Sequence, residues 1–145
     1  MYLEPKVRKE LDDLLCDKYP KIFAERHMDT SSSCMGWGLD CGDGWFDIID
    51  TLCANLQSMT DRNAAPQVVA KQVKEKFGNL CFLYSGGNEV TFGMVMLAQS
   101  MSVRVCEMCG GPRPRKAENG GLQVRCANPH CYYQTDLDSD DFPEE

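Results

Sequence analysis

Four cysteines in the last third of the chain have the spacing of a metal site. Cys106 and Cys109 stand in the segment C-E-M-C-G-G, and Cys126 and Cys131 stand in C-A-N-P-H-C. Two residues between a pair of thiolates let one tight turn direct both sulfurs to the same ion, and structural zinc takes four sulfur or imidazole ligands in tetrahedral geometry. The turn after Cys109 needs a residue with positive φ, which the following glycines supply. The pattern therefore predicts a closed, structural Zn²⁺ site.

The fourth ligand of this site is open between two neighbouring residues. Cys131 would complete a C-x4-C knuckle with Cys126, whereas His130 would bind through an imidazole nitrogen. We favour Cys131, because the C-x4-C spacing makes a roomy second knuckle, and we keep His130 as the alternative. A redox role for C-x-x-C is disfavoured, because that motif needs a strand-to-helix setting and here a polar loop follows it.

The other five of the nine cysteines carry weaker signals. An odd count without a recognisable secretion signal argues against a disulfide framework. Three cysteines beside apolar residues are expected in the core, where a free thiol packs as a small hydrophobe: Cys16, Cys53 and Cys81. Cys34 and Cys41 share one loop and could form a second metal pair, but His27 nearby does not suffice to close such a site.

Charge is unevenly distributed along the chain. The net charge is −7, and residues 136–145, D-L-D-S-D-D-F-P-E-E, hold six acids and no base. An acidic tail of this kind is typically disordered and solubilising. Residues 103–135 are basic instead, with five cations that could contact phosphates if this unit bound nucleic acid: Arg104, Arg113, Arg115, Lys116 and Arg125.

Apolar periodicity predicts several helices. Residues 5–18 form an amphipathic helix with Val7, Leu11, Leu14 and Leu15 on one face. A polar loop over 29–44 leads to a helix over 44–58, for which Asp43 is a suitable N-cap. Residues 66–77 are expected to form a third helix that Gly78 ends.

The segments that follow are more apolar. Residues 79–85, N-L-C-F-L-Y-S, predict a buried strand. Asn88 can cap a fourth helix, on which Met94, Leu97 and Met101 share one face. This helix is apolar nearly all round, so it is expected either to be central in the fold or to form a homo-oligomer interface through residues 88–101.

These elements predict an α+β fold. We expect a mainly helical core domain with one or few short strands over 1–102, a small zinc-ribbon-like unit over 103–134 and a disordered acidic tail over 135–145. No stretch approaches the roughly 20 consecutive apolar residues of a membrane span, so we expect no membrane association.

Three segments of the chain resemble a family of small proteins encoded by bacteriophages and prophages. The segments are G-D-G-W at 42–45, K-E-K-F-G-N-L at 74–80 and C-E-M-C-G at 106–110, and the resemblance spans about residues 10 to 131. It implies a phage protein that acts in the bacterial cytoplasm, and it implies no particular activity. Members of the family often carry histidine near the last ligand position, which keeps His130 in consideration.

The expected function is binding rather than catalysis. No nucleophile and base can be assembled with named roles, and no phosphate-binding glycine loop of the P-loop type is present in the sequence. We expect an accessory protein that binds a host protein, for example to inhibit a defence complex. Trp37, Asp40 and Asp43 of the 31–44 loop are candidate contacts with that partner. Nucleic-acid binding by the basic zinc unit is the alternative.

Overall fold

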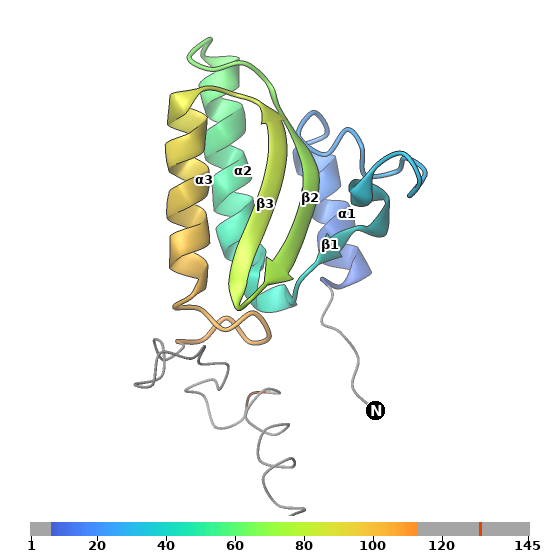
Figure 1. The fold of residues 1–145 in the computed structure, drawn as a ribbon, viewed down its shortest axis with the longest axis vertical. Coiled ribbons are helices and arrows are strands. Elements are labelled where there is room, and N and C mark those ends of the chain that lie inside the picture. Colours follow the sequence, from blue (N-terminus) through green and yellow to red (C-terminus); the bar gives the residue numbers. More distant parts are fainter. Residues whose placement is uncertain (1–6, 113–130, 132–145) are drawn as a thin grey trace, which may run out of the picture.

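A computed structural model of the protein describes residues 7–112 and Cys131 (Figure 1). These residues form an α+β fold, as the sequence predicts, with three α-helices, two short 3-10 helices and a three-stranded sheet in the described part. In chain order the elements are α1 (Lys9–Lys18), η1 (Cys34–Trp37), β1 (Leu39–Asp40), η2 (Asp43–Trp45), α2 (Phe46–Asp61), β2 (Val68–Lys76), β3 (Asn79–Gly86) and α3 (Glu89–Ser102).

The sheet has the order β1-β2-β3 and is mixed. β1 pairs with β2 in parallel, with Leu39 opposite Val73, and β2 and β3 form an antiparallel hairpin. α2 and α3 lie side by side against the hairpin, and α1 lies on the other side of β2, beside β1 (Figure 1). In the described part of the chain, α2 and α3 thus form one helical layer on one face of the hairpin.

The core lies between the hairpin and the helices. Residues of β2 and β3 alternate between buried and more exposed positions, as expected for strands covered on one face. Trp45 at the start of α2 is fully buried and packs in the same cluster as Ile49 of α2 and Phe82 of β3. Trp45 therefore fills the core just before the first turn of α2.

The expected helix over 66–77 is wrong, because these residues form strand β2. A β-bulge between Ala70 and Gln72 shifts the alternation by one residue, so that Val68, Ala70 and Val73 all face the core. The three-residue step from Ala70 to Val73 imitates the i, i+3 spacing of a helix. The main-chain N–H of Ala70 donates to the carbonyl oxygen of Ile22 at 2.8 Å, so the bulge coincides with a contact outside the hairpin.

Gly78 belongs to a hairpin turn rather than to the end of a helix. Lys76 pairs with Asn79 across a two-residue turn, in which Phe77 has φ 54° and Gly78 has φ 83°. Positive φ at both positions is the geometry that matches the twist of a hairpin. Phenylalanine is an uncommon residue in that conformation.

The other three predicted helices need correction in part. α1 begins at Lys9, and Leu14 of its expected apolar face is 45% exposed. α2 begins at Phe46, and Asp43 is not its N-cap; the Asp43 carboxylate accepts the main-chain N–H of Arg8 at 2.8 Å instead. On α3, Asn88 does cap the helix, in a capping box with Thr91. The expected apolar face of α3 is wrong, because Leu97 and Met101 are exposed and the buried residues are mostly smaller: Thr91, Val95, Ala98 and Ser102.

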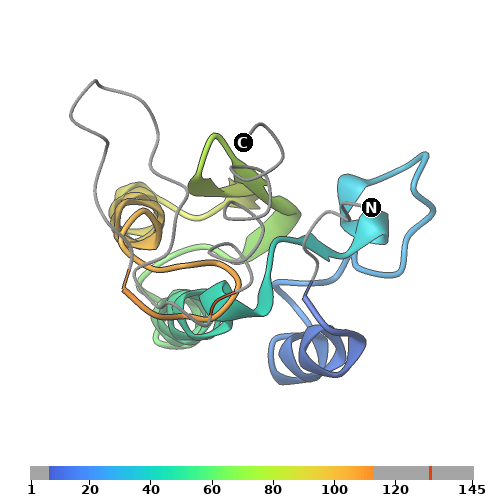
Figure 2. The ribbon, with the colours of Figure 1, turned by 90° about the horizontal axis from the view of Figure 1, so that it is seen from below.

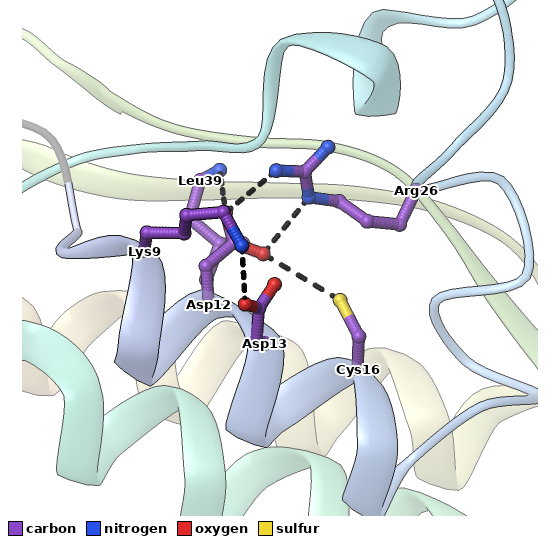
Figure 3. Close-up of polar contacts among 6 residues, drawn as sticks. All are labelled: Lys9, Asp12, Asp13, Cys16, Arg26 and Leu39. Atoms are coloured by element: carbon purple, nitrogen blue, oxygen red, sulfur yellow. Dashed lines mark hydrogen bonds and ion pairs between the residues drawn. The ribbon is translucent and has the colours of Figure 1, made fainter.

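A buried ion pair fastens α1 to the rest of the fold (Figure 3). Asp12 is 4% exposed as a whole residue, and its carboxylate accepts hydrogen bonds from Arg26 Nε at 2.8 Å and Nη2 at 3.2 Å. The Cys16 thiol contacts the same carboxylate at 3.5 Å. Lys9 and Asp13 form a second pair on the outer side of the helix.

In the described residues, no helix is long and apolar enough to cross a membrane.

Candidate metal centre

The segment that follows α3 folds into a tight turn. Val105 pairs with Pro112 in an isolated antiparallel bridge, and inside it the N–H of Cys106 donates to the Gly111 carbonyl oxygen at 2.8 Å. The N–H of Gly110 donates back to the Cys106 carbonyl oxygen at 2.8 Å, and Gly110 has φ 77°. The positive φ predicted for the glycine after Cys109 is therefore confirmed.

This turn brings two thiols together, and Cys131 joins them. The Sγ atoms of Cys106, Cys109 and Cys131 all lie within 4.8 Å of one another, and those of Cys106 and Cys131 are 3.4 Å apart. Cys106 and Cys131 are buried, whereas Cys109 is exposed. The three residues are close enough to bind one metal ion. The remaining predicted ligands, Cys126 and the alternative His130, lie outside the described residues.

Main-chain N–H groups point at the two sulfurs of the turn. The N–H of Met108 donates to Cys106 Sγ at 3.4 Å, and the N–H of Gly111 donates to Cys109 Sγ at 3.3 Å. Hydrogen bonds of this kind favour the charged thiolate over the neutral thiol. They also fix the direction of each ligand, as outer-shell contacts do in metal sites. The arrangement is therefore suited to hold thiolates in place around a cation.

The segment G-D-G-W at 42–45 lies just before α2 and packs against this turn (Figure 2). We call residues 42–45 the seat of the turn. The N–H of Gly44 donates to the Glu107 carbonyl oxygen at 2.6 Å, and the N–H of Gly42 donates to the Glu107 carboxylate at 2.9 Å. The Trp45 indole Nε1 donates to the Val105 carbonyl oxygen at 2.8 Å. Three polar contacts thus join residues 42–45 to residues 105–107.

The two glycines of the seat are required by close approach. A Cβ atom on Gly44 would lie 2.1 Å from the Cys106 carbonyl oxygen, and one on Gly42 would lie 2.2 Å from the Glu107 carbonyl oxygen. Both contacts are far shorter than van der Waals distance and involve main chain, so neither can be relieved by a side-chain rotation. The G-D-G-W segment therefore places the metal-site turn against the core.

Glu107 is a site residue that sequence reasoning did not identify. Its side chain is buried at 4% exposure, between the two cysteines of the turn. Cys41 lies close enough to be influenced by it: burial raises the pKa of the Cys41 thiol, and the Glu107 carboxylate raises it further. Cys41 is therefore a neutral core thiol. The only sequence signal for Glu107 was that it is one of two acids in a unit with five cations.

The remaining cysteines form no second metal site in the part of the chain that the structure describes. Cys34 is exposed and Cys41 is buried, and His27 is exposed on the segment between α1 and η1. Of the cysteines expected in the core, Cys53 is fully buried, while Cys16 and Cys81 are half-buried. Partial burial and the Asp12 carboxylate raise the pKa of Cys16 to about 12.

The candidate partner contacts lie along one segment but differ in their surroundings. Trp37 is 58% exposed at the end of η1, and Met28, on the same connection, is also exposed. Asp40 belongs to β1, at the edge of the sheet. Asp43 is held by Arg8, whose Nε lies 2.6 Å from its carboxylate. Trp37 is therefore the most accessible of the three.

Of the five predicted phosphate contacts, only Arg104 falls among the described residues. It is exposed after α3 and lines an open groove of about 620 Å³ beside the hairpin turn. Lys76 and Phe77 line the same groove, and the described lining includes no carboxylate. Arg113, Arg115, Lys116 and Arg125 lie outside the described residues, as does the acidic tail.

No family model matches the chain, and no curated protein or solved structure is significantly similar to it.

Proposed function

We propose that the metal centre is a structural Zn²⁺ site with four thiolate ligands, Cys106, Cys109, Cys126 and Cys131. The observation that carries this proposal is the cluster of three thiols within 4.8 Å, seated on main chain at the start of α2. Soft thiolate ligands select zinc among the common divalent ions, and a site closed by four protein ligands leaves no position for a substrate. Zinc bound there would stabilise the contact between residues 105–112 and the core.

We further propose that the protein binds another protein and that it is a phage-encoded accessory factor acting on a host complex in the bacterial cytoplasm. The resemblance of three segments to phage proteins supports the setting. The net charge of −7 suits a partner with a basic surface, because opposite potentials speed association and select partners. Inhibition of a defence complex is the form of this activity that we favour.

Trp37 is the contact residue that we assign to this partner. Tryptophan dominates many protein interfaces because it removes a large apolar area from water, and here 58% of Trp37 is exposed. Met28 adds a second exposed apolar side chain on the connection that precedes η1. Neither side chain belongs to the metal centre, so binding and metal retention can be tested separately.

Native mass spectrometry of the purified protein, alone and after incubation with host lysate, tests both proposals. We expect one Zn²⁺ per chain and a retained host protein, which is then purified and titrated directly. Trp37→Ala should abolish that binding and keep the zinc, whereas Leu83→Ala, which removes another exposed apolar side chain, should keep both. Retention of the host protein by Trp37→Ala would contradict the assigned contact, and absence of zinc would contradict the metal site.

One observation favours nucleic-acid binding as a second candidate function. The groove beside the hairpin turn combines Lys76 and Arg104 with Phe77, which is 72% exposed and held at positive φ. Cations and an exposed aromatic ring are the components of a single-strand binding surface. Titration of a single-stranded oligonucleotide at several salt concentrations tests this function. Lys76→Glu and Phe77→Ala should each weaken binding, and Lys9→Glu, an exposed cation of α1, is the control.

A further inference from the structure

The outer face of α3 is apolar and carries no charge between its ends. Five large side chains of this helix are 46–62% exposed: Val90, Phe92, Met96, Leu97 and Met101. From Val90 to Ser102 the helix contains no charged residue. Single exposed apolar residues are ordinary, but a contiguous apolar surface of this kind marks a contact site. α3 forms the outer edge of the helical layer, so no described element covers this face (Figure 1).

Two small residues lie along the centre of this face. At 100° per residue, Gly93 and Ser100 fall on one line of the helix, with Met96 on one side and Leu97 on the other. A Cβ atom on Gly93 would meet no atom within 4 Å, so the packing of this chain does not require glycine there. Glycine lowers the stability of an exposed helix relative to alanine. Close approach of a backbone from outside the chain would explain its presence.

Charged residues of opposite sign stand at the two ends of the face. Glu89 begins α3 and Arg104 follows its last turn, where the Arg104 N–H donates to the Met101 carbonyl oxygen at 3.0 Å. The two residues are equally distant in sequence from the midpoint between Met96 and Leu97. An antiparallel copy of the same helix, centred at that midpoint, places Glu89 of each chain beside Arg104 of the other. It also places Gly93 of each chain beside Ser100 of the other.

We propose that two copies of this chain form a symmetric dimer through antiparallel α3 helices, with Gly93 and Ser100 at the close contact and Glu89–Arg104 pairs at both ends. A two-fold axis makes the same patch serve both chains, which fits a face whose shape and charge are symmetric about its centre. Small residues at the crossing point allow two helices to approach closely, with the flanking Met96 and Leu97 packing around them. The dimer depends on neither the zinc site nor the host partner.

Sedimentation velocity over a concentration series tests the dimer. We expect the wild-type protein to reach the mass of two chains at up to roughly 100 μM, where a complex with a micromolar Kd is nearly all formed. Leu97→Glu buries a charge at the centre of the interface and should give a monomer. Leu14→Glu, at a similarly exposed apolar position on α1, should leave the dimer intact. A wild-type mass of one chain throughout the series would overturn the proposal.

Charge reversal tests the antiparallel arrangement with exposed residues that do not threaten folding. Glu89→Arg alone and Arg104→Glu alone should each raise the dimer Kd by about tenfold, because two attractive pairs become repulsive. The double variant should recover the wild-type Kd, and a mixture of the two single variants should form a heterodimer. A double variant no tighter than the single ones would refute this arrangement.

Gly93→Ala separates close helix contact from unspecific apolar association. It should raise the helical stability of the chain, because alanine is the better helix former, and should nevertheless weaken the dimer, because the added methyl group separates the two helices. Circular dichroism and sedimentation of the same sample measure the two effects. A dimer unaffected by Gly93→Ala, or large aggregates that Leu97→Glu does not dissolve, would overturn the proposed contact.

Discussion

The main-chain N–H of Gly44 lies 2.6 Å from the carbonyl oxygen of Glu107 and donates a hydrogen bond to it. This contact joins the middle of η2, which leads into α2, to the middle of the cysteine turn, so the turn is built onto the core. Trp45, the next residue, is both a fully buried core side chain and a donor to Val105. Changes at the start of α2 should therefore be transmitted to the metal centre.

Gly44→Ala should damage the metal centre without touching a ligand. The added methyl group would lie 2.1 Å from the Cys106 carbonyl oxygen and 2.5 Å from the Gly110 nitrogen, so the turn must move away from α2. We expect a loss of about 1–3 kcal/mol in the free energy of unfolding, measured by urea denaturation, and weaker zinc affinity, measured by competition with a chelator.

The control for this prediction is Ala54→Gly, at an exposed position of α2. It should lower stability by about 1 kcal/mol through helix propensity alone and leave the zinc affinity unchanged. If both variants lost zinc to the same extent, general destabilisation rather than the seat would explain the effect.

Cys106→Ser should abolish stoichiometric zinc binding. Cys106 is fully buried, and its sulfur is 3.4 Å from that of Cys131 and accepts the Met108 N–H. Because the binding energy of a structural metal is folding energy, the variant should also unfold at lower urea concentration than the wild type. Metal content by elemental analysis and the denaturation midpoint check the two outcomes.

Cys34→Ser serves as the matched control, since Cys34 is exposed and lies outside the thiol cluster. It should keep one zinc per chain. The same assay decides between the candidate fourth ligands, because the ligand assignment predicts loss of zinc for Cys126→Ser and retention for His130→Ala. Full zinc content in Cys106→Ser would refute the site.

Asp12→Ala should be among the most destabilising exchanges of a charged residue. Its side chain is 6% exposed and makes the two hydrogen bonds to Arg26, whose own side chain is 20% exposed (Figure 3). Removal leaves a largely buried guanidinium without that partner, which costs about 3 kcal/mol. Asp13→Ala breaks only the exposed i, i+4 pair with Lys9 and should leave stability nearly unchanged, because exposed ion pairs contribute little. Thermal or urea unfolding of the two variants gives the comparison, and similar losses would contradict it.

Three of the four expected helices, the strand after Gly78 and the cysteine turn are confirmed, because each carries a local signal. The 79–85 strand is short and apolar, and the Asn88 side chain caps α3 by accepting N–H groups two and three residues later. The C-x-x-C-G-G segment is closed by hydrogen bonds between its own main-chain groups. β2 was missed because a bulge interrupts the alternation of its core-facing residues. The hydrogen bond at that bulge, from Ala70 to Ile22, joins residues that are far apart in sequence.

The surroundings of the candidate site could not be predicted for the same reason. The role of Gly42 depends on a carboxylate that is distant in sequence, and nothing near Glu107 indicates that its side chain is buried. The exposed face of α3 was misplaced because an all-round apolar helix gives no orientation; smaller side chains pack inward and larger ones remain outside. Periodicity finds a helix, but only the packing partners decide which side is covered.

Asp50→Asn should reduce the loss of stability in acid. Partial burial alone would raise the pKa of Asp50, but hydrogen bonds from Lys18 at 2.8 Å and Tyr19 at 2.6 Å outweigh it and hold the pKa below its ordinary value of 3.8. A carboxylate with a lowered pKa in the folded state stabilises the fold above its unfolded pKa and loses that contribution as the pH falls through the folded value. The wild-type free energy of unfolding should therefore fall more steeply below about pH 4 than that of Asp50→Asn. Urea denaturation at a series of pH values measures this difference, with Asp47→Asn in the first turn of the same helix as the control. Parallel curves for wild type and Asp50→Asn would show that the link from α1 to α2 does not depend on this charge.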